Sequence, residues 1–327
     1  MMEVPIIEIN GLVKKYGSLR AVNNLNLSIN KGEIFGLLGP NGAGKTTTIL
    51  MLLGLTEPTS GKMSVCGYDP IMNPIQIKRK VGYMPDSLGF YKDLTAYENL
   101  SYTARLNGIK EYKLRDHITN VLDLVGLYKV RENKVVTYSR GMKQRLGLAD
   151  VLIRNPEVVI LDEPTLGIDP SGVQDFLRLI KQLNENRKLT VLLSSHYLYQ
   201  VQKICDRVGI FVNGSLLAQG DVNSLASELF GTEPNTIKIT TDTPVEDFKL
   251  IERSLLTLEI VKKVSLLNLN QIIIECKQSC TSTIVRNLVN LNVSICGVEQ
   301  QNYGLDEIYQ RYFENNNSEQ ARRFIKK

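Results

Sequence analysis

Nine consecutive residues near the start of the chain combine three glycines with a lysine and two threonines. They read Gly-Pro-Asn-Gly-Ala-Gly-Lys-Thr-Thr from Gly39 to Thr47, which is the spacing of a phosphate-binding loop. Glycines let backbone amides turn inward, and the start of the following helix adds partial positive charge. The Lys45 ammonium would reach the terminal phosphates, and the Thr46 hydroxyl would bind Mg²⁺. We expect a nucleoside triphosphate to contact Gly39, Asn41, Gly42, Gly44, Lys45, Thr46 and Thr47.

The segments on either side of this loop place it between a strand and a helix. Residues 34–38 form a short apolar run that predicts a buried strand, and residues 46–53 predict a helix that ends near Gly54. A chance glycine-rich turn is the alternative. It would not explain why a strand, a loop and a helix follow one another in this order.

A second pair of chemically active residues follows another apolar strand. Asp162 and Glu163 come directly after the apolar residues 158–161, a run typical of a strand that is covered on both faces. Asp162 could hold Mg²⁺ directly or through water, and Glu163 could polarise an attacking water as a general base. Two adjacent acids are also common on protein surfaces, so this prediction depends on the phosphate loop upstream.

A third candidate site is the start of a helix at residues 138–145, which read Tyr-Ser-Arg-Gly-Met-Lys-Gln-Arg. Ser139 is a preferred N-cap residue, and its hydroxyl, the Gly141 amide and the helix dipole together would attract an anion. The alternative interpretation is an ordinary helix cap that binds no ligand.

Composition and charge exclude several classes of protein. The chain has 327 residues, of which 43% are hydrophobic and 22% charged, as is ordinary for a globular protein of two domains. Apolar runs are too short for a membrane span, and the first residues lack the features of a secretory signal. A net charge of +5 without a basic stripe argues against nucleic acid as a partner. We therefore expect a cytoplasmic protein whose five scattered cysteines are reduced and serve as small core residues.

The order of the predicted elements indicates an α/β protein. Apolar strands, the first two expected at 6–13 and 25–29, alternate with helices, which predicts a largely parallel sheet with helices on both faces. Residues 95–107 and 114–125 predict helices of an insert that spans about 87–150. Ligands of such sheets bind at the carboxyl ends of the strands. The residues that follow predicted strand ends, and can therefore converge, are Lys45, Asp86, Asp162, Glu163 and His196.

The pattern changes after residue 225. Residues 226–235 resemble a linker, and residues 236–300 predict strand, helix, strand, strand, helix and strand, the order of a small ferredoxin-like α+β domain. Its first helix is expected at 244–255. A last amphipathic helix and a basic tail fill residues 301–327. The chain is thus expected to have a nucleotide-binding domain, residues 1–225, and a small C-terminal domain.

Together these motifs resemble the ATP-binding subunits of ATP-binding cassette (ABC) transporters, over residues 6–222. The family signature Leu-Ser-Gly-Gly-Gln is kept at Ser139 and Gly141, its two phosphate-contacting positions. The resemblance implies a P-loop ABC cassette with a helical insert, and ATP and Mg²⁺ as cofactors. The departures from the signature resemble the drug and polysaccharide exporter branch (ABC-2 type); they are Tyr138, Arg140 and Met142.

The resemblance also implies roles that spacing alone leaves open. Tyr16 would stack on adenine, His196 would contact the γ-phosphate, and Asp169 would lie in the loop that crosses to a second subunit. Asp86 stands where the family has a glutamine that touches Mg²⁺ and senses the membrane partner. A carboxylate keeps the acceptor oxygens but adds a charge. Without the resemblance, Tyr16 and His196 could equally be ordinary surface residues.

By the same likeness, the chain works in a pair, either with its own copy or with a similar ATPase subunit. The Ser139 side of one chain would meet the triphosphate on the Lys45 side of the other, head to tail with twofold symmetry. Hydrolysis would then let the chains separate. A separate transmembrane permease would convert closure into transport, which places the chain at the inner face of the cell membrane. Phe90 and Tyr91 are candidates for contact with the permease, or else core residues.

Two other functions fit the same nucleotide motifs. One is a soluble ABC-type ATPase that acts on ribosomes or nucleic acid. Such proteins usually carry two cassettes in tandem or a long coiled coil, and neither is found in this sequence. The other is a regulatory nucleotide switch with slow turnover, against which Glu163 and His196 favour hydrolysis.

Overall fold

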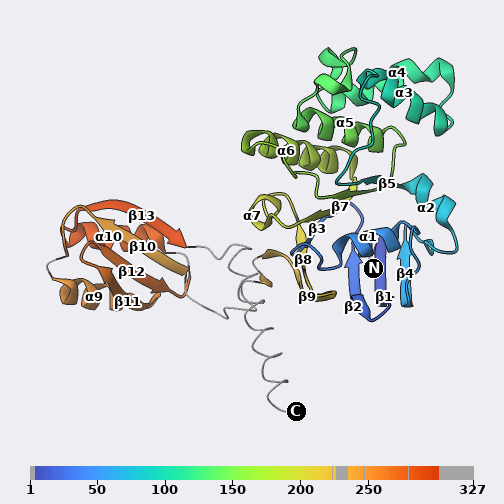
Figure 1. Cartoon of the computed structure of the whole chain (residues 1–327). Helices are drawn as coiled ribbons and strands as arrows, with labels where there is room; N and C mark the ends of the chain where they lie inside the picture. The colour runs from blue at the N-terminus through green and yellow to red at the C-terminus, as the bar shows by residue number, and fades with distance from the viewer. Residues whose placement is uncertain (1–3, 223, 226–234, 246, 279, 302–327) are drawn as a thin grey trace. The chain divides into compact units, whose positions relative to one another are not determined.

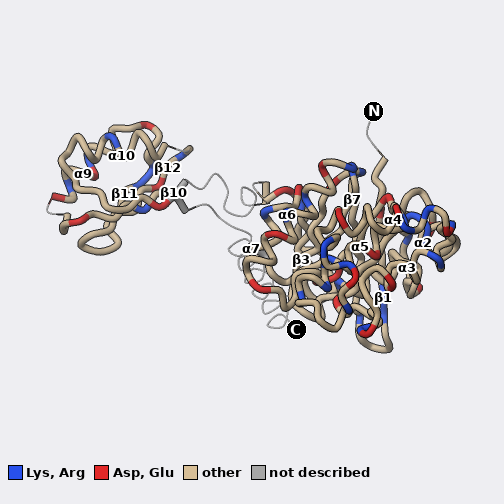
Figure 2. Tube along the Cα trace, turned by 90° about the horizontal axis from the view of Figure 1, so that it is seen from above, with Lys and Arg blue, Asp and Glu red and all other residues tan. Residues whose placement is uncertain are grey.

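The computed structural model describes residues 4–222, 224–225, 235–245, 247–278 and 280–301. The chain divides into two compact units, residues 1–222 and 223–327 (Figure 1). Each unit has a hydrophobic core of its own. Acidic and basic residues are distributed along both units (Figure 2).

A six-stranded sheet forms the centre of the first unit, with the strand order β5-β6-β7-β3-β8-β9. Neighbouring strands are parallel from β5 to β8, and β9 is antiparallel to β8. Every residue of β3, β6 and β7 is buried, as expected for parallel strands that are covered on both faces. The predicted, largely parallel sheet is therefore confirmed. Its strands are β3 (Ile34–Leu38), β5 (Val81–Met84), β6 (Val158–Asp162), β7 (Thr190–Ser195), β8 (Arg207–Val212) and β9 (Ser215–Gly220).

A smaller antiparallel sheet, with the order β2-β1-β4, shares a hydrophobic core with the central sheet. Helix α1 (Lys45–Leu52) contacts β2, β4 and β6, and its Ile49 and Leu52 are buried. The expected strand at 25–29 begins earlier, because pairing with β1 continues as far as Leu19 opposite Tyr16. The strands are β1 (Ile7–Tyr16), β2 (Leu19–Ile29) and β4 (Ser60–Val65).

Helices cover the central sheet and form the predicted insert between β5 and β6. The insert helices α3 (Ala96–Leu106), α4 (Glu111–Leu124) and α5 (Arg140–Leu152) contact one another, and α5 also contacts β5 and α6. Helix α3 starts at a capping box, in which the Glu98 amide donates to the Thr95 hydroxyl and the Thr95 amide donates to the Glu98 carboxylate. The remaining helical segments are α2 (Pro74–Lys80), α6 (Pro170–Arg187), α7 (Leu198–Val201), and the 3₁₀ turns Tyr128–Val130 and Val135–Thr137.

The second unit is built around a four-stranded antiparallel sheet with the order β11-β12-β10-β13. Its core combines sheet residues such as Ile239 and Ile274 with helix residues such as Leu255 and Leu288. The first helix starts a few residues later than predicted, because the Asp247 carboxylate caps it by accepting from the Leu250 amide. The elements are β10 (Asn235–Thr241), α9 (Phe248–Leu256), β11 (Val261–Asn268), β12 (Gln271–Cys276), α10 (Thr281–Asn290) and β13 (Ile295–Gln301).

Several sequence predictions lie outside the described residues or need correction. Most of the linker, the last amphipathic helix and the basic tail are outside the described ranges. All five cysteines are free, and Cys276 and Cys280 are buried as expected, but Cys296 is exposed and is therefore no core residue. Among the residues described, no helix has the length and apolar character that crossing a bilayer requires.

Candidate functional site

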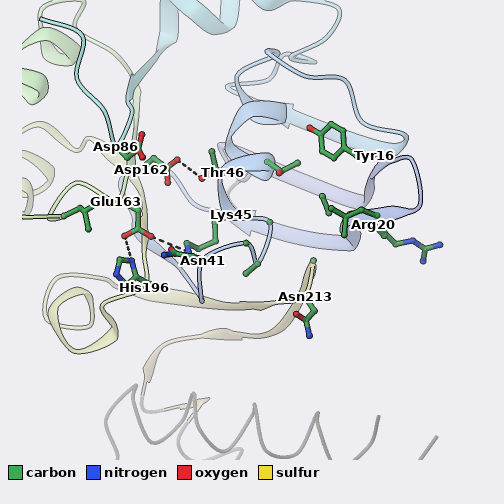
Figure 3. Close-up of a pocket in the computed structure, with 18 residues that line it drawn as sticks. Tyr16, Arg20, Asn41, Lys45, Thr46, Asp86, Asp162, Glu163, His196 and Asn213 are labelled. Atoms are coloured by element: carbon green, nitrogen blue, oxygen red, sulfur yellow. Dashed lines mark hydrogen bonds and ion pairs between the residues drawn. The ribbon is translucent and has the colours of Figure 1, made fainter. Parts of the chain in front are cut away.

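A cavity of about 670 Å³ opens at the carboxyl edge of the central sheet (Figure 3). Its walls come from the loop after β3, the ends of β5, β6 and β7, the start of β2 and the turn after β8. We call it the nucleotide cavity. The structure brings most of the predicted site residues together around it, namely Tyr16, Asn41, Gly42, Gly44, Lys45, Thr46, Thr47, Asp86, Asp162, Glu163 and His196.

The phosphate loop can take its shape only because glycine occupies its tightest positions. Gly44 has φ +107°, and a Cβ atom there would lie 2.3 Å from the carbonyl oxygen of Ala21 and 2.8 Å from the Phe211 ring. Gly42 also has a positive φ, but a Cβ there would meet nothing within 4 Å. The loop is therefore pressed against the strands on one side and open on the other.

The Lys45 ammonium is held by backbone oxygens of its own loop. It donates to the carbonyls of Gly39 at 2.7 Å and Pro40 at 3.1 Å. Lys45 is only 5% exposed, and its Nζ also lies 3.4 Å from Glu163 Oε1. A buried cation with an acid partner is thus fixed at the wall of the nucleotide cavity. Gly39 does not line this cavity itself, although its carbonyl helps to position the lysine.

Glu163 links the phosphate loop to the end of β7. Its Oε2 accepts a hydrogen bond from His196 Nδ1 at 2.8 Å, while Oε1 faces Lys45 (Figure 3). The backbone of Glu163 has φ 48°, a conformation that costs a non-glycine residue free energy, and its amide donates to the Ser194 carbonyl at 3.0 Å. The carboxylate is therefore held in place by its backbone, a cation and an imidazole, next to the space that a phosphate would fill.

Two of the three residues predicted to bind Mg²⁺, Thr46 and Asp162, are in contact with each other. The Thr46 hydroxyl donates to Asp162 Oδ2 at 2.9 Å, and the second carboxylate oxygen, Oδ1, is buried without a hydrogen-bond partner in the described part of the chain. Mg²⁺ is held in nucleotide sites by one or two carboxylates and hydroxyls together with substrate phosphates, so this donor set fits the ion. Asp86 lines the same cavity but is exposed. Burial, with Asp162 and Asp86 nearby, raises the pKa of Tyr83 to about 12.

The opposite end of the nucleotide cavity carries an aromatic ring. Tyr16 is 48% exposed, and Lys14 Nζ lies 4.8 Å from its ring centroid. The ammonium is anchored there by the Glu57 carbonyl at 2.7 Å. One face of the ring is thus backed by a cation, which leaves the other face for a planar ligand group.

Sequence reasoning missed five residues that complete this end of the cavity. They come from the start of β2 and from the turn that joins β8 to β9; they are Leu19, Arg20, Ala21, Asn213 and Gly214. The turn had a readable signal, because Asn-Gly between two apolar runs predicts a two-residue hairpin. Both turn residues have positive φ angles, 48° and 80°. No motif marked the residues of β2.

Ser139, Gly141 and Asp169 do not line the nucleotide cavity. Ser139 is exposed and caps α5, accepting from the Met142 amide at 3.2 Å, and Asp169 caps α6, accepting from the Gly172 amide at 2.9 Å. The two caps are neighbours: Arg140 Nε donates to the Leu166 carbonyl at 2.7 Å. Bonds from the Gly172 amide and the Ser171 hydroxyl lower the pKa of Asp169. These candidate phosphate contacts therefore lie outside the nucleotide cavity, although Leu166, which Arg140 contacts, lines it.

Comparison with known proteins identifies the family. A model described as ABC transporter matches residues 22–166. The bacitracin transport ATP-binding protein BcrA of Bacillus licheniformis is 45% identical over 214 residues, which are 65% of this chain and 69% of that protein. The linearmycin resistance ATP-binding protein LnrL of Bacillus subtilis is 39% identical over 250 residues, 76% of this chain and 79% of that protein. The structure of cbiO1 from Clostridium perfringens, part of the ABC transporter complex cbiONQ, matches with a TM-score of 0.63 and 25% identity, over 78% of this chain and 96% of that one.

These likenesses confirm the resemblance that the sequence motifs gave, and with it the P-loop ABC cassette fold of the first unit. Proteins of this family bind ATP with Mg²⁺, hydrolyse it to drive transport, and work as dimers beside separate transmembrane permease subunits. The chain belongs to the ATP-binding subunits of ABC transporters.

Proposed function

We propose that two copies of this chain, or this chain and a similar ATPase subunit, close around ATP in a head-to-tail dimer, and that hydrolysis reopens it. The observation that carries the proposal is the separation of two phosphate-binding surfaces. Lys45, Thr46 and Glu163 line the nucleotide cavity, whereas Ser139 and Gly141 lie outside it at an exposed helix start. A triphosphate held by one surface would leave its outer oxygens for the other surface of a second chain.

Within the nucleotide cavity, we assign each residue a role from its contacts. Lys45 neutralises the terminal phosphates, and Thr46 and Asp162 hold Mg²⁺, which spreads the charge of the reacting phosphate. Glu163 accepts a proton from the attacking water. Its Oε1 contact with Lys45 has to give way to the phosphate, and the His196 bond at 2.8 Å then keeps the carboxylate in place. Asp86 completes the metal-side wall, and Tyr16 stacks on adenine.

The two named relatives favour export of an antibiotic. One relative is named for bacitracin transport and the other for linearmycin resistance, and the signature departures at residues 138–142 resemble the drug and polysaccharide exporter branch (ABC-2 type). We infer that a separate permease carries an amphiphilic antibiotic outward, powered by this subunit. The chain would then lie in the cytoplasm, peripheral to the inner face of the membrane.

The permease contact is proposed at a cavity of about 300 Å³ on the insert, lined in part by Tyr83, Leu88, Phe90, Tyr91 and Tyr102. We call it the docking cavity. Tyr91 is 55% exposed, which favours contact with a partner over a core role. The backbone at Tyr91 is held by the buried side chain of Asn99 in α3, which accepts from the Tyr91 amide at 2.9 Å and donates to the Tyr91 carbonyl at 3.0 Å. The docking cavity begins at the end of β5, next to Asp86.

For the domain organisation, we propose a nucleotide-binding domain at residues 1–225 with its insert at about 87–150, a linker at 226–235, and a ferredoxin-like domain at 236–300. The strand order β11-β12-β10-β13 and the alternation of strands and helices support the last assignment. The break between the compact units at 222 and 223 supports the first boundary.

The dimer proposal is tested with Glu163→Gln, which keeps the shape of the side chain but removes its charge and its basicity. ATP hydrolysis should fall by about 10²- to 10⁴-fold, the contribution of a general base, and the variant should form stable dimers in ATP and Mg²⁺. Phosphate release measures the first effect, and light scattering after size exclusion measures the second. Glu185→Gln, at an exposed position of α6, is the control and should behave as wild type.

A second substitution separates dimer formation from nucleotide binding. Ser139→Arg in the Glu163→Gln chain should abolish the ATP-dependent dimer while ATP still binds, because Ser139 lies outside the cavity that holds the nucleotide. Monomeric Glu163→Gln protein at saturating ATP would overturn the proposed dimer.

A further inference from the structure

A second large cavity, of about 550 Å³, lies on the first unit at the opposite edge of the sheet from the nucleotide cavity. Lys78 and Arg79, which line it, belong to α2, and α2 leads directly into β5. Arg154, on the same wall, precedes β6. The cavity is therefore lined by segments that lead into the amino-terminal ends of these strands, and none of its lining residues is shared with the nucleotide cavity. We call it the basic cavity.

The basic cavity concentrates positive charge that the described residues neutralise only in part, since the carboxyl of Asp150 interacts electrostatically with Arg154. Lys78, Arg79 and Arg154 line it and no acidic residue does. Among the ion pairs of the described residues, none involves these three side chains, whereas the neighbouring Lys80 is paired with Glu157. The Nε atom of Arg154 is buried without a hydrogen-bond partner in the described ranges. A buried donor without an acceptor is costly, but this atom is covered by protein, so an anion in the cavity would contact the more accessible part of the guanidinium.

The remaining walls fix the shape of the basic cavity. His117 Nε2 donates to the Ile153 carbonyl at 2.6 Å, which ties α4 to the end of α5. The Arg154 guanidinium contacts the Lys78 carbonyl at 3.5 Å, so α2 is attached to the same place. The basic residues of α2 are visible in Figure 2. These contacts hold Lys78 and Arg79, near the end of α2, and Arg154, just after α5, in place around the cavity.

Large apolar side chains are exposed next to these charges. Met72 and Ile75, before and within α2, are 78% and 64% exposed, and Leu106 at the end of α3 is 70% exposed. Ile75 also lines the cavity, as does Asn107, which follows Leu106. Cations flanked by exposed apolar side chains suit an amphiphilic surface better than a water-soluble polyanion.

The basic cavity also lies next to the proposed docking cavity on the same two helices. Helix α3 and its C-cap supply Thr103 to the docking cavity and Asn107 to the basic cavity, about one helical turn apart. Helix α5 likewise supplies Asp150 to the docking cavity, and Arg154, just after α5, lines the basic cavity. A subunit that contacts its permease through the docking cavity would bring the basic cavity close to the membrane.

We propose that the basic cavity binds the phosphate headgroups of anionic phospholipids at the bilayer surface. Lys78, Arg79 and Arg154 neutralise the phosphate oxygens, and Met72, Ile75 and Leu106 enter the boundary between headgroups and acyl chains. This contact goes beyond the ATPase cycle and depends on the proposed permease docking only for its location. It would orient the subunit on the membrane before or during its association with the permease.

The test uses the full-length chain and vesicles without any permease. Sedimentation with phosphatidylglycerol-containing vesicles should show binding that weakens with salt, and pure phosphatidylcholine vesicles should bind little. The double substitution Lys78→Ala and Arg79→Ala, at two exposed positions, should weaken binding about 25-fold, since each basic residue near an anionic surface contributes about fivefold. Adding Arg154→Ala should bring the loss to about 125-fold.

The matched control is Lys62→Ala with Lys129→Ala, two exposed lysines away from the cavity, which should change vesicle binding less than about twofold. The basic C-terminal tail is unchanged in all variants, so its contribution cancels. Equal losses in the control and the cavity variants would overturn the proposal. So would vesicle binding that is indifferent to all three cavity residues, or a site that takes inorganic phosphate or single-stranded DNA but no vesicle.

The variant with Lys78→Ala and Arg79→Ala should hydrolyse ATP and form ATP-dependent dimers normally. This result would separate the lipid proposal from the dimer proposal. Neither residue contacts the nucleotide cavity, so a loss of lipid binding with intact ATPase activity supports the lipid site. A variant that keeps its thermal transition but loses both lipid binding and ATPase activity would contradict the lipid proposal, because the loss would then not be confined to the membrane contact.

Discussion

The phosphate loop offers a sharp test, because the same substitution at two of its glycines should have different consequences. Alanine at Gly44 must adopt a backbone with φ +107° and place its methyl group 2.3 Å from the Ala21 carbonyl oxygen and 2.8 Å from the Phe211 ring. The nearest contact is backbone of β2, which cannot turn aside as a side chain would. Alanine at Gly42 has the same conformational problem, with φ +78°, but no steric one.

The free energies follow from these two contributions. A positive φ costs a non-glycine residue roughly 1–2 kcal/mol, and overpacking adds about 1–3 kcal/mol. Gly42→Ala should therefore lower the unfolding free energy of the first unit by about 1.5 kcal/mol. Gly44→Ala should lower it by about 3.5 kcal/mol. For a unit of this size, 1 kcal/mol corresponds to about 3 °C in Tm, so the expected shifts are about 4 °C and about 10 °C.

Differential scanning calorimetry of the full chain measures both shifts. The chain has two compact units and more than one transition is expected, so the transition of the first unit is identified by its upward shift with ATP and Mg²⁺. The second unit provides an internal reference, because its transition should not move in either variant. Equal losses at the two glycines, or a larger loss at Gly42, would refute the argument that contact with β2 sets the shape of the loop.

Two further predictions concern the base-binding end and the thiols. Tyr16→Ala should weaken ATP binding by about 5- to 100-fold, the contribution of one base stacked on an aromatic ring, whereas Tyr16→Phe should bind ATP normally. A competition titration with a fluorescent nucleotide measures both affinities. Equal losses in the two variants would exclude stacking. Burial raises the pKa of the Cys66 thiol from 9.0 to about 11. Between these pH values the unfolded chain has lost a thiol proton that the folded chain retains. The unfolding free energy should therefore fall as pH rises from about 9 to about 11, by up to about 2 kcal/mol. Urea titrations of wild type and Cys66→Ala measure the difference, and a Cys66→Ala chain with the same pH dependence would contradict the assignment.

Two side chains hold the Glu163 carboxylate at the wall of the nucleotide cavity. In this structure the carboxylate is divided between Lys45 at 3.4 Å and His196 at 2.8 Å. A phosphate that approaches Lys45 competes with Oε1 for the same cation, while the histidine contact is undisturbed. Binding of ATP would then free the carboxylate to accept a proton without letting it move away, which fits the role of a general base.

Local sequence determined the chemistry of the site and the order of most elements. The loop from Gly39 to Thr47, the acids after β6 and the histidine after β7 could be placed at one edge of the sheet because each follows an apolar strand, and parallel strands end at a common edge. The second unit was also predictable in its order of elements, since its strands and helices are short and separated by polar turns. Boundaries moved where pairing or capping extended or shortened an element, as at Leu19 and Asp247.

Only the tertiary structure decided which residues share a surface. It separated Ser139 from the nucleotide cavity of its own chain, and it brought the turn at Asn213 to the same cavity as Tyr16. It also joined Lys78 and Arg154, far apart in sequence, in one cavity. The spacing and type of residues indicate which chemistry a side chain can perform, because its reactivity depends mainly on the groups next to it. Which side chains meet depends on how helices pack on the sheet, and that packing is set by contacts between segments that no short motif records.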